Sequence, residues 1–440
     1  MDELSIIVSL LFLLTISAAY LYSGGFFSVA FLIMLYISFL YLGSLNFYFT
    51  QGHLTFVFVF LMALFYLIGL ILGKKFTKPK PFKDPIKIYN PLNSSILKLS
   101  MLFIFLLSLS LSFYWVKKFG IPLFERAWYT TGIEATTGIY NRMLFSTGIQ
   151  GLLIISLLCY GMYKVQKESF FKYLFLFSFF IHVIFTTLVG GKAVAIMPFL
   201  LILMTMFYTN RRISKKLLAI GGTLALLLAL FIGFFWTGTF SLYETLKLFY
   251  TRATYDAVLH LDYLLYEYAP NHSYQFGQTV LLELKRIIAQ ITSIPKEPLF
   301  NEIIGNLREG APIYRVTGIS PEISLFGMAY ANFGIVGAIF TAIIFGFIAQ
   351  CINIYFISKK SINLFSFGLW IFFMYKLLGL VRSGNVLISL QSFLIEILPI
   401  TALIFVCYLS LALPFPNALK WKKLHYTRRN VNETKSVTYN

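Results

Sequence analysis

Charged residues are scarce in this chain, and acidic residues are the scarcest of them. Only 12% of the 440 residues are charged, and 17 acidic residues stand against 36 basic ones. The cysteines Cys159, Cys351 and Cys407 lack the paired spacing of a zinc site, a redox motif or a disulfide framework. A His-x-x-x-His pattern and a glycine-rich phosphate loop are also absent. These absences argue against a metal hydrolase and a nucleotide-driven pump, so we expect no metal site and no cofactor.

Long apolar runs dominate the rest of the sequence. Hydrophobic residues make up 58% of the chain, and they gather in about eleven runs of roughly 17 to 25 residues, each long enough to cross a bilayer as a helix. The runs lie near residues 4–22, 26–45, 54–73, 96–116, 143–163, 173–190, 193–209, 217–236, 335–357, 365–381 and 386–411.

Positive charge marks one side of these runs. Residues 74–93 hold six lysines, and a short loop this basic is retained in the cytoplasm. When the sides alternate from that loop, 22 basic and three acidic residues fall inside, whereas 14 of each fall outside. The basic surplus therefore reflects topology, and no nucleic-acid partner is indicated.

The sequence thus predicts an all-α polytopic integral membrane protein with about 11 transmembrane helices, its N-terminus outside and its C-terminus cytoplasmic. We expect one transmembrane domain over residues 1–440 in the cytoplasmic membrane, an outer loop at 117–142 and a basic cytoplasmic tail at 412–440. Residues 237–334 form a large outer loop before the ninth span, and 323–334 are its re-entrant or interfacial lead-in.

Two surface helices are predicted in the large outer loop, over residues 239–268 and 278–294. The second ends before Pro295 and has the pattern of a helix that lies in the membrane interface. Its apolar face comprises Val280, Leu281, Leu284, Ile287, Ile288 and Ile291.

Arginine is concentrated on the outer side, whereas lysine dominates inside. The planar fork of arginine suits bidentate binding of phosphate, so we expect an anionic, phosphate-bearing ligand at the outer face. Alternatively, several of these arginines pair with outer carboxylates or extend to lipid headgroups. The candidate binding residues are Arg142, Lys192, Arg252, Arg286, Arg315 and Arg382.

Candidate acid and base groups follow in the same loop. Arg252, Asp256 and His260 stand at four-residue steps, which places them on one face of a helix. They offer a cation, a carboxylate and a base for proton transfer, although such triplets also arise in charged helices with no catalytic role. Together with Glu322, Asp256 and His260 form the candidate catalytic set.

Several short motifs resemble the oligosaccharide repeat-unit polymerases, the O-antigen (Wzy-type) polymerases. The outer loop begins with Gly120-Ile121-Pro122-Leu123-Phe124 and ends with Asn141-Arg142, and a Gly-Gly-Lys turn follows at Lys192. Further along stand Tyr274-Gln275-Phe276-Gly277, Ile294-Pro295-Lys296-Glu297-Pro298, Pro321 and the segment from Tyr330 to Gly337. Relatives often carry arginine where this chain has Lys192, which keeps the charge but loses the bidentate fork.

The resemblance implies a metal-independent membrane glycosyltransferase that polymerises polyprenyl-diphosphate-linked oligosaccharide repeat units at the outer face of the cytoplasmic membrane. Its partners would be these lipid-linked oligosaccharides, membrane lipid, a flippase and a chain-length regulator. A ligase of the O-antigen-ligase type would use the same donor and much the same architecture. A flippase or transporter of the lipid-linked sugar is a further alternative, which internal repeats would favour.

Overall fold

The computed structural model describes residues 3–48, 53–77, 86–89, 94–125, 139–189, 192–210, 215–238, 240–251, 256–292, 294–312 and 322–412. Almost all of these residues are helical, as the apolar runs predict. The protein is an all-α polytopic membrane protein with one small sheet, β1 (Lys87–Tyr89) paired in parallel with β2 (Ser361–Asn363).

Each of the eleven apolar runs coincides with a helical segment over most of its length. The segments are α1 (Glu3–Ser23), α2 (Val29–Tyr48), α3 (Leu54–Thr77), α4 (Ser94–Phe119), α7 (Ile139–Phe145) with η2 (Ser146–Gln150) and α8 (Gly151–Gln166), α9 (Ser169–Leu188), α10 (Lys192–Asn210), α11 (Lys215–Thr237), α17 (Ser324–Ser358), α18 (Leu364–Ser383) and α19 (Val386–Ala412). Eight helices in the described residues are long and apolar enough to cross a membrane. The apolar stretches Val29–Leu45, Pro198–Thr209 and Val386–Ile395 are shorter, so the exact number of spans stays a prediction.

The predicted large outer loop contains more helices than the two expected. They are α12 (Leu242–Tyr250), α13 (Asp256–Tyr263), η4 (Leu264–Tyr268), α14 (Ala269–Asn271), α15 (Gln278–Ile291) and α16 (Phe300–Arg308). Glu302 explains the unpredicted helix α16, because its carboxylate accepts the backbone N–H of Leu299 at 2.8 Å and so caps the first turn.

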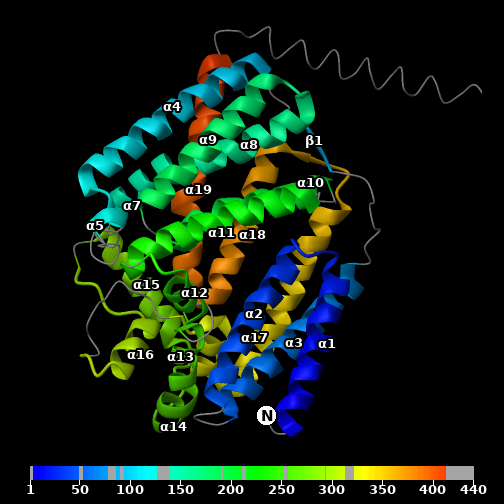
Figure 1. The fold of residues 1–440 in the computed structure, drawn as a ribbon, viewed down its shortest axis with the longest axis vertical. Coiled ribbons are helices and arrows are strands. Elements are labelled where there is room, and N and C mark those ends of the chain that lie inside the picture. The colour runs from blue at the N-terminus through cyan, green and yellow to red at the C-terminus, as the bar shows by residue number, and fades with distance from the viewer. Residues whose placement is uncertain are drawn as a thin grey trace, which may run out of the picture.

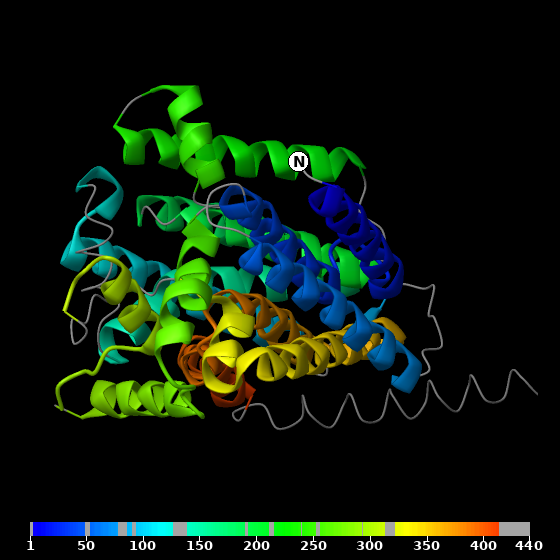
Figure 2. The same cartoon turned by 90° about the horizontal axis from the view of Figure 1, so that it is seen from below.

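The connecting elements segregate to two ends of the helix bundle. In Figure 1, α5 (Pro122–Glu125) and α7 lie at the left and α12 to α16 below them at the lower left, whereas β1 lies at the upper right. Figure 2 shows the same separation, with the green and yellow-green helices of residues 240–310 on one side. The described helices of the two predicted outer loops thus lie on the same side of the bundle.

Two helices far apart in sequence, α3 and α17, form the most extensive helix–helix contact in the described structure. Glycines allow this close approach, because a Cβ atom built on Gly69 would lie 2.1 Å from the carbonyl oxygen of Ile343. A Cβ atom on Gly346 would likewise lie 2.3 Å from the carbonyl oxygen of Tyr66. Small residues at such contacts let helix backbones pack closely in a membrane, where lipid gives little hydrophobic drive for association.

The predicted lead-in is separated from its span by a kink at Gly334. Helix α17 continues on both sides of this residue, but Gly334 itself has φ 66° and ψ −161°. This conformation is not helical, and its positive φ favours glycine. The first segment, residues 324–333, is held by the preceding loop, since Gln275 N–H donates to the Ala331 carbonyl at 3.0 Å and Phe276 N–H to the Asn332 carbonyl at 3.1 Å. Irregular backbone is tolerated at membrane depth where protein contacts satisfy it in this way.

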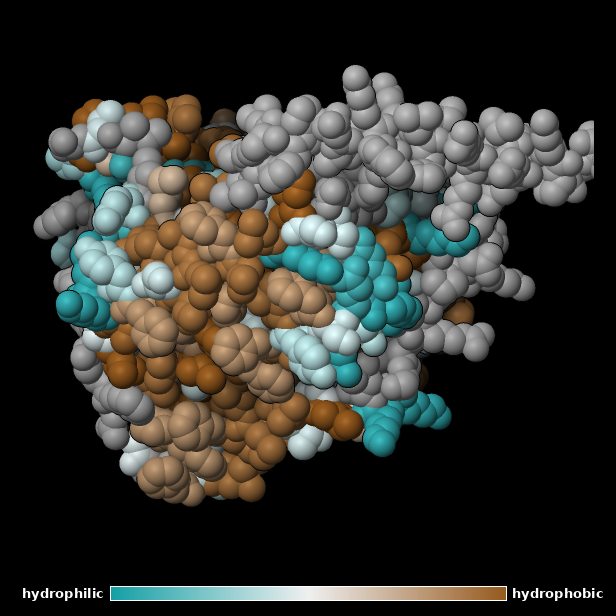
Figure 3. Space-filling view, turned by 90° about the horizontal axis from the view of Figure 1, so that it is seen from above, coloured by the Kyte–Doolittle hydropathy of each residue, from teal (hydrophilic) through white to brown (hydrophobic). Residues whose placement is uncertain are grey.

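The surface matches a membrane protein as well. Figure 3 shows one face on which hydrophobic side chains form a broad area with hydrophilic side chains toward its two sides. Many large apolar residues on the spans are exposed, among them Leu14, Phe103 and Phe340 at 55–65% of their full accessibility. Lipid hydrocarbon accounts for this exposure, which in water would be unfavourable.

Orientation across the membrane can be tested by cysteine labelling. In a variant that lacks the three native cysteines, Lys167→Cys lies in an exposed loop predicted to be cytoplasmic, and Asn271→Cys lies in an exposed part of the large outer loop. A membrane-impermeant maleimide added to whole cells should label only N271C, because the positive-inside rule keeps the lysine-rich side in the cytoplasm. If K167C is labelled in intact cells and N271C is not, the protein has the opposite orientation in the membrane.

Candidate functional site

Helix α15 turns its polar residues toward the protein and its apolar residues outward. Thr279, Glu283 and Arg286 are exposed by only 2%, 1% and 7%, and Gln290 is half-buried on the same face. These residues follow at steps of four, three and four, which is the spacing of one helix face. The docking of α15 on the bundle therefore depends on directional polar contacts.

The outward face of α15 consists of apolar side chains. Val280, Leu281, Leu284 and Ile288 are 42–50% exposed. In water, the exposure of each side chain would forgo about 25 cal/mol of stabilisation per Å² of apolar surface left unburied. This exposure fits the sequence expectation of a helix in the membrane interface.

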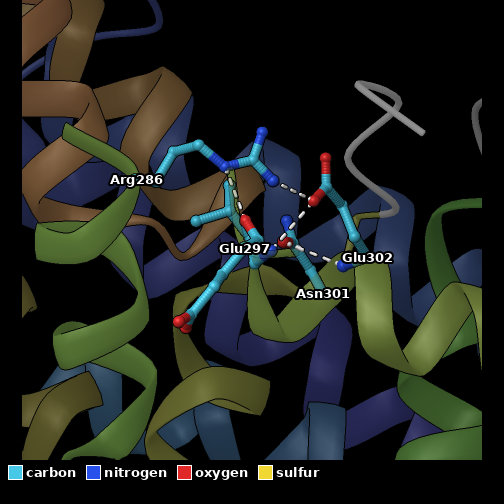
Figure 4. A network of polar contacts seen from close by, with 5 residues as sticks. Arg286, Glu297, Asn301 and Glu302 are labelled. Atoms are coloured by element: carbon cyan, nitrogen blue, oxygen red, sulfur yellow. Dashed lines mark hydrogen bonds and ion pairs between the residues drawn. The ribbon is translucent and has the colours of Figure 1, made fainter. Parts of the chain in front are cut away.

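Arg286 is the most buried of the candidate cations whose side chains are described. Its Nη2 forms an ion pair with Glu302 on α16, and its Nε donates to the Glu297 carbonyl at 2.8 Å (Figure 4). Only 9% of the Arg286 side chain and 2% of the Glu302 side chain are exposed. Removing one partner of such a pair leaves a buried charge, which typically costs about 3–5 kcal/mol. Arg286 therefore has a structural partner in addition to any ligand.

Three cations from two parts of the chain share one electrostatic environment. Burial lowers the pKa of Lys296, and the charges of Arg286 and Arg142 lower it further, whereas Glu302 opposes them. Glu297 does not balance this group, because its carboxylate pairs with Lys285 at 3.0 Å on the exposed side of α15. We call Arg142, Arg286 and Lys296 the cation cluster; Glu302 is the carboxylate that acts against it.

Two glutamines connect the cation cluster to span α19. Arg142 on α7 donates through Nη1 to Gln391 Oε1 at 3.4 Å, and Gln391 Nε2 donates to Gln290 Oε1 on α15 at 2.7 Å. Helices α7, α15 and α19 thus meet at these side chains. Arg142 is half-buried, so part of its guanidinium is available to a ligand.

The sequence analysis did not identify Lys296. The residue lies in the Ile294-Pro295-Lys296-Glu297-Pro298 segment that carries part of the family resemblance. A single loop lysine after a proline has no local signal for binding, and only the folded chain brings it near Arg142, more than 150 residues earlier.

A second charged pair joins two residues that the sequence analysis selected separately. Arg382 Nε lies 3.1 Å from Glu322 Oε1, and 47% and 33% of the two side chains are exposed. The Tyr36 side chain interacts electrostatically with both, and its hydroxyl is buried with no hydrogen-bond partner among the described residues. A cation, a carboxylate and a hydroxyl therefore meet where α18 ends and the lead-in begins.

Glu283 links α15 directly to the start of α19. Its Oε1 accepts the N–H of Val386 at 3.2 Å, and its Oε2 accepts those of Leu387 and Ile388 at 2.6 and 3.1 Å. Burial raises the pKa of the Glu283 carboxyl, and the three amide donors oppose this rise because they stabilise the charged form. The residue was not selected from the sequence.

The remaining candidates are placed only in part. Arg252 and Arg315 lie outside the described residues. Lys192 begins α10 and Asp256 begins α13, but the description of these two residues does not extend to their side chains. His260 is half-buried one helical turn after Asp256. Which of these candidates acts on a substrate stays a prediction.

Asp262 is another carboxylate in the predicted outer loop, and it was not selected as a candidate from the sequence. It is 4% exposed and accepts a hydrogen bond from Thr55 Oγ1 on α3 at 2.5 Å. Burial raises the pKa of Asp262, while Thr55 lowers it and Glu267 raises it further. Its bond to Thr55 gives Asp262 a structural role that joins α13 to the first helices of the bundle.

Comparison with known proteins gives one informative match. No curated protein and no solved structure matches the chain. The model of a family described as putative O-antigen polymerase matches residues 25–379, which include the two loops and most of the helices described above. The resemblance found in the short motifs is thereby confirmed. This chain belongs to the O-antigen polymerase family, whose members act in the biosynthesis of surface polysaccharides.

Proposed function

We propose that this protein transfers a glycan from a polyprenyl-diphosphate carrier onto a second lipid-linked repeat unit at the outer face of the membrane, and so lengthens a surface polysaccharide. The observation that carries the proposal is the cation cluster, in which the charges of Arg142 and Arg286 act on the half-buried Lys296 and Glu302, the partner of Arg286, opposes them. The cluster lies beside α15, whose exposed apolar face suits the interface where a lipid diphosphate resides.

The chemistry requires positive charge at the leaving group. An acceptor hydroxyl attacks the anomeric carbon, the bond from that carbon to the diphosphate oxygen breaks, and the lipid diphosphate leaves with the electron pair. Cations fixed in place near that oxygen stabilise the charge that develops, and a site with little water strengthens the effect. Arg142 and Lys296 are half-buried and would contact the diphosphate oxygen. Arg286 is already neutralised by Glu302 and would mainly orient the diphosphate.

The acceptor hydroxyl must lose its proton during the transfer. Glu322 is the first candidate for the base, because its carboxylate is partly exposed and Arg382 at 3.1 Å favours the charged form that accepts a proton. Asp256 and His260 are the alternatives from the sequence. In this arrangement Arg382 orients the base, a different role from the diphosphate contact that the sequence suggests for it.

Lys192, Arg252 and Arg315 remain proposed contacts to the glycan or the diphosphate. A flippase that delivers the lipid-linked unit and a chain-length regulator are the proposed protein partners. A ligase would use the same cation cluster with another acceptor, so the product distinguishes the two activities.

Replacing the half-buried cations should impair transfer without unfolding the protein. We expect R142A and K296A each to slow transfer about tenfold to a hundredfold, since a charge-assisted hydrogen bond contributes roughly 1.5–3 kcal/mol. R142K should recover activity only in part, because lysine lacks the bidentate fork. The measurement is the polymer ladder from cells, in which single lipid-linked repeats should accumulate.

The matched control for this experiment is K285A. Lys285 is a neighbouring cation on α15, but it is half-exposed and pairs with Glu297 away from the cluster. It should make polymer of normal amount and length. Normal polymer from both R142A and K296A would place the diphosphate elsewhere.

The pH dependence of transfer should identify the base. A carboxylate base must be ionised, so the rate of the wild-type protein should fall as the pH drops through the pKa of that group. We expect E322Q to reduce kcat by about 100-fold or more and to abolish this acidic limb, whereas D256N and H260Q should retain it. Retention of the limb in E322Q, together with its loss in either other variant, would assign the base to that residue.

Activity should not depend on a divalent metal or a nucleotide. Arginine and lysine can neutralise a diphosphate in the way that a bound metal ion does in other transferases. We therefore expect purified protein in nanodiscs to extend a lipid-linked repeat unit in excess EDTA at an undiminished rate. Loss of polymer that magnesium or manganese restores would contradict this expectation.

A further inference from the structure

The first amides of helix α19 are capped by a side chain from another helix. The first amides of a helix have no partner within the helix, and they need an acceptor from elsewhere. In the preceding turn, Ser383 Oγ accepts the N–H of Asn385 at 3.3 Å, and the Asn385 carbonyl accepts the N–H of Ser389 at 3.1 Å, so these two acceptors serve other amides than those of residues 386–388. The acceptor is Glu283, a residue about 100 positions earlier on another helix.

The contact of Glu283 with α19 is strong and directional. Its two oxygens accept three consecutive N–H groups at 2.6–3.2 Å, and the carboxylate meets the positive end of the helix dipole. Within the described part of the chain, Glu283 forms no ion pair with a basic side chain. The amides of α19 are therefore the groups that stabilise its buried charge.

This contact also determines the position of α15. Because Val280, Leu281, Leu284 and Ile288 point outward, the hydrophobic contact of α15 rests on few side chains, chiefly Leu282 and Ala289, and non-directional packing of this kind does not fix how far the helix slides along α19. The alignment depends on Glu283 at one end of the contact and on Gln290 at the other, where Gln391 donates to it at 2.7 Å. Arg286 lies between these two residues on the same face of α15.

We propose that Glu283 is a positioning residue, which caps α19 from α15 and thereby holds Arg286 and the adjoining Lys296 loop opposite Arg142. This inference rests on the proposed function, since the cation cluster is the site that it aligns. Glu283 itself touches neither the diphosphate nor the acceptor. Its effect on transfer is exerted through Arg286.

A double-mutant cycle separates positioning from a general loss of structure. The purified protein is assayed in nanodiscs with a polyprenyl-diphosphate-linked repeat unit, and kcat and KM are determined for wild type, E283Q, R286M/E302M and the triple variant. Methionine replaces both members of the buried ion pair, so no lone charge is left in the interior. All activities are expressed per folded molecule.

We expect E283Q to lower kcat about tenfold or more in the wild-type background and to change KM less than about threefold. In the R286M/E302M background the same substitution should lower kcat less than about twofold, because residues that act through one another are not additive. Equal losses in the two backgrounds would overturn the proposal, since they would show that Glu283 acts independently of Arg286.

A second variant removes the contact from the other helix. V386P deletes one of the three donors at the first position of α19, where proline is well tolerated and where Val386 is 42% exposed. V386P should also lower kcat, by a smaller factor than E283Q does. The matched control is D262N, which alters another buried outer-loop carboxylate, bonded to Thr55, and should leave kcat per folded molecule unchanged.

Hydrogen exchange tests the contact without reference to activity. The amides of residues 386–388 should exchange at least about tenfold faster in E283Q than in the wild type or D262N, because glutamine offers one acceptor oxygen in place of two and carries no negative charge. Unchanged exchange at these amides would overturn the proposed contact. If exchange responds but wild-type protein extends no lipid-linked repeat, the proposed function fails while the link between α15 and α19 holds.

Discussion

The first three N–H groups of α19 need an acceptor from outside the helix, and an amide that is covered without one costs about 1–3 kcal/mol. Glu283 accepts all three from α15, and this one carboxylate ties the predicted outer loop to α19. The positions of Arg286 and Gln290 follow from it because they extend from the same helix face. The helices of the predicted outer loop are thus held against the bundle by polar contacts between protein side chains and backbone amides.

The charged groups at this end fall into two kinds. The Arg286–Glu302 pair is almost fully buried, and its members stabilise each other and the first turn of α16. Arg142, Lys296, Arg382 and Glu322 are only partly covered. Exposed ion pairs contribute about 0–1 kcal/mol to stability, so these residues can be directed to a ligand at little cost to the fold. The buried pair gives rigidity, and the partly exposed charges give reactivity.

Much of the fold could be predicted from local patterns. Apolar runs predicted the long helices of the bundle, and the spacing of Val280, Leu281, Leu284 and Ile288 predicted the apolar face of α15. The arginine pattern selected Arg142 and Arg286 before their proximity was known. These inferences succeed because periodicity and charge are properties of contiguous residues.

The remaining features depend on contacts between distant segments. Nothing near Glu283 indicates that it caps a helix about 100 residues later, and nothing near Lys296 indicates that Arg142 lies beside it. The partnership of Arg382 with Glu322 and that of Arg286 with Glu302 are likewise pairings that only the fold creates. Helices α12, α13 and η4 lie within the helix predicted over residues 239–268, whereas α16 is a helix that no local pattern predicted.

The balance of charge in the cation cluster has a consequence for catalysis. A sugar diphosphate ester carries less negative charge than the lipid diphosphate released from it, so three cations against Glu302 bind the group more strongly as the bond breaks than before. Only interactions that strengthen toward the transition state raise kcat, whereas equal binding of substrate and transition state lowers KM alone. The ion pair with Glu302 lowers the net positive charge of the cluster. Because Arg142 and Lys296 are partly exposed, water and salt would weaken their attraction to the released lipid diphosphate. Under the proposed function, an excess of buried arginines without countercharges would hold the released carrier too tightly, whereas the pairing of Arg286 with Glu302 would allow both bond cleavage and turnover.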